Sequence, residues 1–183
     1  MKTIGDLAAS ALWILESLPS HLRYRWYRSK YDLADSFEFN GPQTKFEGDG
    51  EIAIGERSYL GRNSFINSDD GYTVEIGDDC AIGHYVRFYT SSYRARQDFS
   101  DRPLDHHYGD ISIGDAVWIG VFCFISNGIT IGDNTVVGAN STVTRHLPPH
   151  AICAGSPARV IRFKPYLNES DRERLYEEFS EVV

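Results

Sequence analysis

The sequence predicts an all-β fold in which short parallel strands wind into a β-helix, with helical segments at both ends. Three observations predict it: an aliphatic residue recurs at every sixth position, glycine usually follows it, and polar pairs such as Asp-Asn come next. A period of six fits neither the 3.6-residue period of an α-helix nor the two-residue period of a simple strand. It fits short strands joined by tight corners, with one branched aliphatic side chain pointing inward from each strand.

The clearest repeat begins at Ile113 and ends near Pro148-Pro149. Its hexapeptides read IGDAVW, IGVFCF, ISNGIT, IGDNTV, VGANST and VTRHLP, and IGERSY, LGRNSF, IGDDCA and IGHYVR precede them in the same phase. The fifth positions of the clearest repeat hold apolar or small residues: Val117, Cys123, Ile129, Thr135, Ser141 and Leu147. Stacked strands of this kind bury a continuous aliphatic column, so each coil depends on its neighbours.

The composition is that of an ordinary soluble globular chain of one domain. Its formal charge of −8 argues against a general electrostatic surface for nucleic acid. The cysteines Cys80, Cys123 and Cys153 are too scattered for a disulfide framework or a Cys-x-x-Cys metal site, which favours a reducing compartment. Cys80 and Cys123 occupy fifth positions of hexapeptides, so we expect them to be buried packing residues and not nucleophiles.

The N-terminal part differs from the repeat. Ile4–Leu18 has helical spacing, and residues 21–31 are basic and aromatic. The apolar run 7–15 is shorter than the ~20 residues of a membrane span and lacks the features of a signal peptide, so we expect a cytoplasmic protein. Two interpretations stay open for this part. It caps the first coil, or residues 7–31 contact a membrane surface or a lipid-linked acceptor.

Three segments are therefore expected: a helical cap over 1–40, a β-helix over 41–163 and a helical tail over 164–183. In the tail, Ser170-Asp-Arg-Glu173 has the pattern of a capping box that opens a helix through Phe179. Two excursions interrupt the β-helix, a short one over 67–75 and a long polar loop over 91–110. Long loops within a compact repeat are commonly functional.

From about Leu60 to Phe163 the sequence resembles the hexapeptide-repeat O-acetyltransferases, which include galactoside, maltose, nodulation-type and polysaccharide acetyltransferases. The most specific stretch is IGDAVWIGVFCFISNGITIGDNTVVGANSTVTRHLPPHAICAGSPARVIRF. The resemblance implies a left-handed β-helix with three hexapeptides per coil, an exception to the usual right-handed crossover. It also implies acetyl-CoA as co-substrate, no metal, and a homotrimer with active sites between subunits.

The resemblance also implies roles for residues at matching positions. Trp118 is expected to line the channel for the pantetheine arm, and backbone groups of Val121 and Ala139 to contact that arm. Four polar residues fall at positions near the cofactor or its phosphates: Thr144, Arg145, Arg159 and Arg162. Guanidinium groups suit phosphate because they bind its oxygens bidentately. The alternative for Arg159 and Arg162 is a solvated basic face.

On the acceptor side, Asn67 matches an asparagine that binds a sugar, although an Asn that opens a polar excursion is also typical of a turn. His84, the third residue of its hexapeptide, is expected to point outward at a corner and face the neighbouring subunit. The acceptor itself is expected to be a sugar or a polysaccharide-type hydroxyl compound, by analogy alone.

The catalytic base departs from the family pattern. Such an enzyme needs a base with a pKa near 7 to deprotonate the acceptor hydroxyl, and the family supplies a His at the start of the long loop. Here the stretch reads YTSSYR, and Tyr93 stands at that position. Because the ordinary pKa of Tyr is ~10 against ~6.5 for His, ionising Tyr at pH 7 costs roughly 4 kcal/mol. Tyr93 is therefore a poor base, although it could orient the acceptor.

Our hypothesis is that His106 or His107, at the far end of the same loop, replaces the missing base. Asp105 or Asp110 is expected to orient the imidazole. The alternative is that both histidines are simply solvated. His146 and His150 flank the Pro-Pro pair and are expected to play no chemical part.

Two rival functions follow from the same residues. One is a γ-type carbonic anhydrase, which needs three His around zinc at inward coil positions that this sequence does not provide. The other is a catalytically impaired homotrimer that binds or assembles without chemistry, and Tyr93 is the observation that favours it.

Overall fold

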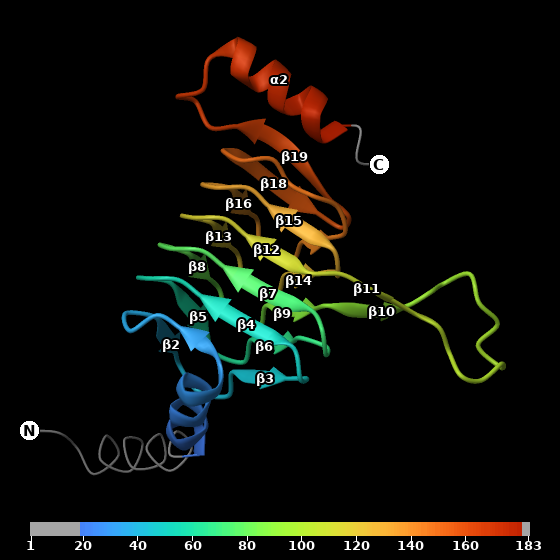
Figure 1. The fold of residues 1–183 in the computed structure, drawn as a ribbon. Coiled ribbons are helices and arrows are strands. Elements are labelled where there is room, and N and C mark those ends of the chain that lie inside the picture. The colour runs from blue at the N-terminus through green and yellow to red at the C-terminus, as the bar shows by residue number, and fades with distance from the viewer. Residues whose placement is uncertain (1–18, 181–183) are drawn as a thin grey trace, which may run out of the picture.

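The computed structural model describes residues 19–180, which form a left-handed parallel β-helix of five coils with a helix at each end (Figure 1). The predicted fold class is therefore confirmed. The expected helical segment Ile4–Leu18 lies outside the described residues. Within residues 19–180, no helix is long and apolar enough to cross a membrane.

Three parallel sheets form the sides of a prism, and each coil contributes one strand to each sheet. Sheet 1 contains β1 (Asp32–Leu33), β4 (Glu51–Ile54), β7 (Thr73–Ile76), β12 (Ile111–Ile113) and β15 (Ile129–Ile131). Sheet 2 contains β2 (Glu38–Asn40), β5 (Tyr59–Gly61), β8 (Ala81–Ile82), β13 (Trp118–Ile119), β16 (Val136–Val137), β18 (Ala151–Gly155) and the antiparallel β19 (Ala158–Phe163). Sheet 3 contains β3 (Lys45–Glu47), β6 (Phe65–Asn67), β9 (Arg87–Tyr89), β14 (Phe124–Ile125) and β17 (Thr142–Val143).

The core is the column that the hexapeptide repeat predicts. The leading aliphatic residues of the repeat are all at most 3% exposed: Ile54, Leu60, Ile76, Ile82, Ile113, Ile119, Ile125, Ile131, Val137 and Val143. Fifth-position residues from Val117 to Leu147 are buried as well. Glycine follows the aliphatic residue because successive coils touch there. A Cβ on Gly120 would lie 2.5 Å from the backbone nitrogen of Ala139 in the next coil.

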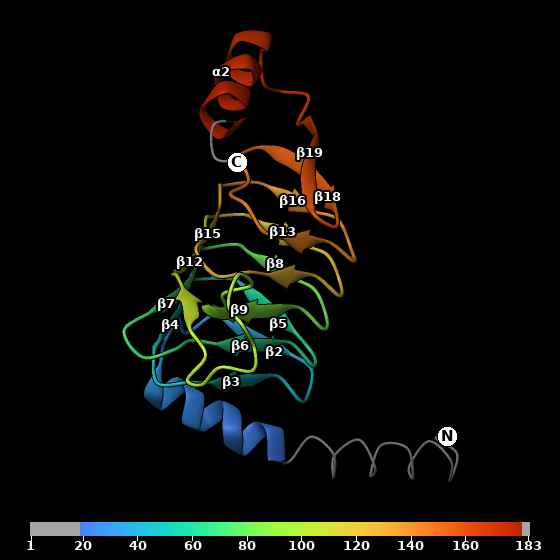
Figure 2. The same ribbon diagram turned by 90° about the vertical axis from the view of Figure 1, so that its right-hand side faces the viewer.

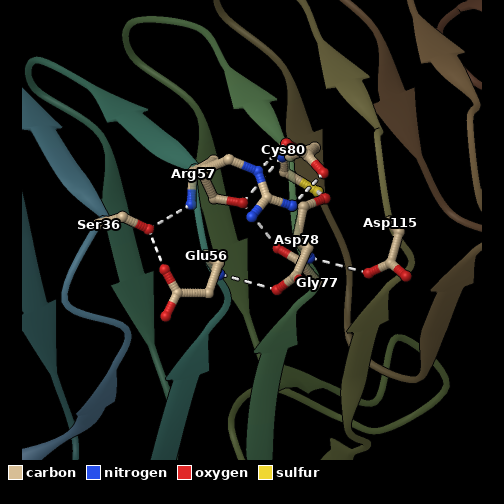
Figure 3. A network of polar contacts seen from close by, with 9 residues as sticks. Ser36, Glu56, Arg57, Gly77, Asp78, Cys80 and Asp115 are labelled. Carbon is tan, nitrogen blue, oxygen red and sulfur yellow. Dashed lines mark hydrogen bonds and ion pairs between the residues drawn. The ribbon is translucent and has the colours of Figure 1, made fainter.

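The acidic residue after each glycine has a structural role at the corner between sheets 1 and 2 (Figure 3). The carboxylate of Asp78 accepts a hydrogen bond from the backbone N–H of Glu56 at 2.8 Å, and Asp115 accepts one from Asp78 at 2.8 Å. Asp133 repeats the contact with Asp115 at 3.0 Å. Each coil therefore anchors the corner of the coil before it, which explains why the repeat reads Ile-Gly-Asp.

All three cysteines are buried and free, which confirms that Cys80 and Cys123 are packing residues. Burial raises the pKa of the Cys80 thiol to about 11 and that of Cys153 to about 12. The Sγ of Cys80 lies 3.1 Å from the carbonyl oxygen of Gly114 in the next coil. These thiols stay protonated at neutral pH and are not nucleophiles.

The N-terminal boundary lies earlier than predicted. β1 and β2 already pair with β4 and β5, so the first coil begins at Asp32, inside the segment expected to be a cap. The sequence concealed this coil because Phe39 and Asn40 stand where the next coil has the aliphatic Leu60 and Gly61. The described part of the preceding helix, residues 19–30, lies across the base of the stack (Figure 2).

Aromatic residues fix this helix to the first coil. The ring of Tyr24 stacks on Phe39 with centroids 3.9 Å apart, and Tyr27 stacks on Phe46 at 4.6 Å. The Tyr24 hydroxyl donates to the carbonyl of Gly41 and accepts from the next strand's backbone, both at 2.9 Å. The basic and aromatic segment is thus a cap in its described part. Membrane contact through residues 7–31 stays a prediction.

At the other end, β18 and β19 reverse the chain and α2 (Glu169–Ser180) follows. The predicted capping box at Ser170–Glu173 is wrong. The side-chain oxygen of Asn168 accepts hydrogen bonds from the backbone N–H of Asp171 and the hydroxyl of Ser170, both at 2.8 Å. Asn168 is therefore the N-cap, two residues before the predicted Ser170, and the helix begins at Glu169.

Candidate active site

Two hollows on the outward face of sheet 2 lie along one column of side chains, and together they are called the groove. Strand register places one outward residue per strand in a single column: Tyr59, Ala81, Trp118, Val136, Ile152 and Arg162. Neighbouring strands lie roughly 4.8 Å apart, so the column extends for more than 20 Å, about 4.8 Å per step. Trp118 is 56% exposed although it is the largest apolar side chain of the column. The column is a long apolar strip that ends in a guanidinium group.

The lower hollow of this groove has a volume of about 430 Å³. Trp118, Val121, Ala139 and His84 all line it, so four of the predicted site residues come together there. Glycines on the floor bring the backbone to the surface, which suits contacts through main-chain groups. The Nδ1 atom of His84 accepts a hydrogen bond from the backbone N–H of Arg62 at 3.1 Å, which fixes the imidazole at the corner.

The upper hollow, about 460 Å³, is basic. It is lined by Arg162 from β19 and by Arg172 from α2, together with Ile152 and Ile161. The Nε of Arg172 is the one buried side-chain polar atom of residues 19–180 without a hydrogen-bond partner. A second nitrogen of the same guanidinium donates to the carbonyl oxygen of Pro165 at 3.2 Å. A buried, unpartnered cationic donor favours an anionic ligand in this hollow.

Three other predicted cofactor residues lie outside both hollows. Thr144 and Arg145 follow β17 in sheet 3, and Arg159 lies in β19 with its guanidinium donating to the carbonyl of Ala158 at 2.8 Å. Their cofactor roles stay predictions.

The long excursion is an antiparallel hairpin, β10 (Ser91–Tyr93) and β11 (His106–Tyr108), that projects from the stack (Figure 1). Tyr93 and His106 lie directly opposite each other, with ring centroids 4.4 Å apart. Both ring nitrogens of His106 lack a hydrogen-bond partner among the described residues. Tyr93 is 53% exposed. The hairpin therefore brings the two candidate groups into contact.

His107 points to the opposite face of the hairpin, because side chains alternate along a strand. Its Nδ1 lies 2.9 Å from the Nδ2 of Asn127. The Oδ1 of Asn127 accepts hydrogen bonds from the hydroxyls of Ser92 and Ser126, each at 3.1 Å, so the Asn127 amide nitrogen is the donor to His107. Neutral His107 then carries its proton on Nε2 and has no free lone pair.

The carboxylates of Asp105 and Asp110, which were predicted to orient a histidine, bind other groups. Asp105 forms an ion pair with Arg94 at 2.8 Å, and Asp110 accepts a hydrogen bond from the backbone N–H of Thr73 at 2.9 Å. The prediction that one of them orients a histidine is therefore wrong. An uncharged amide, Asn127, holds His107 instead.

The face with Tyr93 and His106 looks toward the short excursion. Tyr108, on that face, stacks on Tyr72 with centroids 5.1 Å apart. In the same excursion, the Nδ2 of Asn67 donates to the carboxylate of Asp69 at 2.9 Å, and the hydroxyl of Thr90 donates to it at 2.8 Å. The side-chain Oδ1 of Asn67 has no partner among residues 19–180, so it is available as an acceptor.

The groove and the hairpin lie on different edges of the prism. The lower hollow reaches the corner between sheets 2 and 3, whereas the hairpin leaves the corner between sheets 3 and 1, on the side away from β13 (Figure 1). A single chain does not bring Trp118 and His106 together. Over the described part of the chain, no group of three or more His, Cys, Asp or Glu side chains is arranged to hold a metal ion.

Comparison with known proteins now identifies the class. The family model for the bacterial transferase hexapeptide (six repeats) matches residues 110–145, and that for the hexapeptide repeat of succinyl-transferase matches residues 51–84. A hexapeptide-repeat acetyltransferase of Vibrio cholerae O1 biovar eltor, VCA0836, solved with acetyl coenzyme A, is 33% identical with a TM-score of 0.67. The match covers 83% of this chain and 81% of that one. The chain belongs to the hexapeptide-repeat acetyltransferase family.

Two further relatives carry galactoside acetyltransferase names. Galactoside O-acetyltransferase of Escherichia coli K12 is 35% identical over 132 residues, which are 70% of this chain and 63% of that protein. A galactoside acetyltransferase solved with coenzyme A superposes with a TM-score of 0.68 at 29% identity, covering 89% of this chain and 85% of that one. The chain thus spans less than two thirds of the length of the E. coli enzyme.

Sequence reasoning missed two residues of the site. Arg172 reaches the groove only because the chain reverses at β18 and β19, and no motif around it signals that position. The sequence does mark Asn127: in ISNGIT, Ser126-Asn127 replaces the Gly-Asp pair of hexapeptides such as IGDAVW and IGDNTV. A departure from a repeat is where a functional residue is expected.

Proposed function

We propose that this protein is an acetyl-CoA-dependent O-acetyltransferase that acts on a hydroxyl of a sugar or polysaccharide-type acceptor. The observation that carries the proposal is the groove on sheet 2, an apolar column that begins at Tyr59 and ends at two arginines, Arg162 and Arg172. A long, thin ligand with an apolar arm and a phosphorylated end matches that arrangement. Acetyl-CoA has this form and supplies an activated thioester.

The described residues fit such a ligand. Trp118, Val121 and Ala139 would hold the pantetheine arm, because they line a hollow with glycine at its floor. Arg162 and Arg172 would hold phosphate oxygens, and the unpartnered Nε of Arg172 would gain a hydrogen bond on binding. Thr144, Arg145 and Arg159 are further candidates through the family resemblance alone.

His106 is the proposed general base. An acceptor hydroxyl must lose its proton as its oxygen attacks the thioester carbonyl, and an imidazole suits that task at neutral pH. Free ring nitrogens support His106, whereas the hydrogen bond from Asn127 leaves neutral His107 without a lone pair. We assign Tyr93 and the side-chain Oδ1 of Asn67 to orienting the acceptor by hydrogen bonding.

The active site is proposed to form between copies of the chain in a homotrimer. The groove and the hairpin lie on different edges of one prism, so a complete site needs the hairpin of a neighbouring copy. His84, beside Trp118 in the groove, would then face that hairpin.

The test is a transfer assay with acetyl-CoA and a panel of sugars, read by release of free CoA thiol. The variant H106A should lower kcat/KM by a factor of about 100 or more, the usual contribution of a general base. H107A is the matched control from the neighbouring position and should lower it by less than about tenfold. Equal losses in the two variants, or unchanged activity in H106A, would contradict the assignment of His106.

A binding or scaffold protein is the second candidate, and Tyr93 at the family histidine position favours it. This alternative predicts saturable binding of acetyl-CoA with no transfer to any sugar of the panel. Acetyl transfer that depends on His106 would exclude it.

A further inference from the structure

A second groove lies on the outward face of sheet 3, near the base of the stack. It has a volume of about 510 Å³ and lies between the cap helix and strands β3, β6 and β9. Neither the repeat nor the family resemblance assigns these lining residues. Three kinds of side chain meet there: cations, aromatic rings and uncharged amides.

The cations are Arg23 from the cap helix, Lys45 from β3 and Arg87 from β9. None of them has an ion-pair partner among residues 19–180. Arg23 contacts the carbonyl oxygen of Thr44 at 3.5 Å, and Arg87 donates to the carbonyl oxygen of Asn63. In a chain of net charge −8, three uncompensated cations around one groove produce a local field that attracts an anion.

The rings are Phe65 and Tyr89, whose centroids lie 5.2 Å apart with planes inclined by 35°. The Arg87 guanidinium lies 6.0 Å from the centre of the Phe65 ring. Two adjacent rings on a flat strand surface form an apolar platform, and ring faces pack well against the C–H face of a pyranose. The amides of Gln43 and Asn63, at the rim, can both donate to and accept from sugar hydroxyls.

The groove adjoins the proposed acceptor site. Tyr89 pairs in register with Asn67 on the neighbouring strand, and both residues alternate with buried ones, so they share the outward face of sheet 3. The chain continues from Tyr89 into β10, which carries Tyr93. A sugar bound on the ring platform is therefore next to the residues that orient the reacting hydroxyl.

We infer that this groove binds an oxyanion-bearing sugar unit of the acceptor, one that carries a carboxylate or a phosphate. The inference rests on the proposed function, because it names the substrate class of that same site. A neutral sugar would use the rings and amides but would leave three cations without a counter-charge. Nucleic acid also bears phosphates, but the protein carries a net charge of −8, so a saccharide is the better fit.

The experiment compares three acceptors that differ in one group: a neutral hexoside, the corresponding uronic acid and the corresponding hexoside phosphate. The wild-type protein should transfer acetyl groups to at least one charged acceptor with a kcat/KM about tenfold or more above that for the neutral one. The charged acceptor with the higher kcat/KM identifies carboxylate or phosphate as the recognised group. The preference should shrink in 0.5 M salt, because screening weakens exposed charge pairs.

Variants of the lining residues then test whether the preference for the charged acceptor arises in this groove. The double variant R23Q/K45Q should lower kcat/KM for the charged acceptor about tenfold, with the neutral acceptor and the affinity for free CoA unchanged. R25Q is the matched control, because Arg25 lies on the same helix, is exposed and lines no part of this groove. Loss with the neutral acceptor as large as with the charged one would indicate a structural effect and overturn the inference.

Direct titration of the uronic acid and the sugar phosphate, followed by NMR, separates this inference from the proposed function. Groove-dependent binding without any acetyl transfer would contradict the proposed function and leave the binding site standing. Transfer with no charge preference and no effect of R23Q/K45Q would overturn the inference alone. Variant-sensitive binding of an oligonucleotide, with no binding of either charged sugar, would also overturn it.

Discussion

The groove on sheet 2 and the hairpin of residues 91–110 both belong to the proposed active site, but their structures are determined differently by the sequence. The groove is made of strands that repeat at a fixed register, so Trp118, Val136 and Ile152 follow one another as a direct consequence of the hexapeptide period. The hairpin interrupts that period, and its pairs, such as Tyr93 with His106, belong to no repeat.

This difference shows which part of the site can change without affecting the packing of the coils. Any substitution on the floor of the groove also affects the packing of coil on coil, because glycines there touch the next backbone. A substitution in the hairpin affects the hairpin and its contacts with Asn127, at the corner after β14, and with Tyr72 in the short excursion. The groove can therefore stay unchanged while residues of the hairpin, such as Tyr93, vary.

The largest effect on stability is expected on the floor of the groove. In G120A, the added Cβ would meet the backbone nitrogen of Ala139 at 2.5 Å, which should destabilise the fold by about 3 kcal/mol. The control is G71A, in the short excursion, where a Cβ meets nothing within 4 Å but the φ of +77° is unfavourable for alanine. That change should cost about 1 kcal/mol in denaturant unfolding. Equal costs would show that close approach between coils does not limit the groove.

The next largest effect concerns the basic end of the groove. R172A should weaken binding of CoA by about 2 kcal/mol, the usual contribution of a hydrogen bond between charged groups. Binding of acetyl-pantetheine, which lacks the nucleotide and its phosphates, should be unchanged in the same calorimetric titration. A matched loss for both ligands would mean that Arg172 supports the fold of the hollow instead of binding phosphate.

A smaller effect is expected at the hairpin. Y93F keeps the aromatic contact with His106 and removes only the hydroxyl, so kcat/KM should fall by about 1 kcal/mol or less, the usual contribution of one hydrogen bond. The pH profile should keep its shape, because the proposed base is His106. A drop as large as that of H106A, or a shift of the profile toward high pH, would make Tyr93 the base.

The smallest effect is expected at a corner that lies outside the site. The hydrogen bond from the Arg57 guanidinium lowers the pKa of the Asp79 carboxyl. Because the folded pKa lies below the unfolded one, the pair stabilises the protein at pH values above about 4 and loses this contribution as the pH falls through the folded pKa. In R57Q, NMR titration should show the Asp79 pKa higher than in wild type, and the stability difference should vanish near pH 2.

The fold could be predicted from the sequence because the same hexapeptide pattern occurs many times along the chain. Ile113, Ile119 and Ile125 each mark an inward position, and one misread hexapeptide would not have altered the conclusion. The first coil escaped detection because aromatic residues such as Phe37 and Phe46 fill it without the glycine pattern. The helix start was misplaced because Asn168 caps as well as Ser does.

The site could be predicted only where it follows the repeat. Trp118, Val121 and Ala139 lie together in the groove because strand register places them there. The contact of Arg172 with the groove depends on a chain reversal that no local pattern specifies. The separation of His106 from His107 onto opposite faces depends on the register of the hairpin, which the loop sequence did not reveal.

The most direct test of the central claim is a calorimetric titration of the purified protein with acetyl-CoA, with free CoA for comparison. The account predicts saturable binding near one site per chain, weakened in W118A and unchanged in H106A, since Trp118 lines the groove and His106 does not. An absence of binding at millimolar acetyl-CoA, or equal weakening in both variants, would contradict the assignment of the sheet 2 groove to the cofactor.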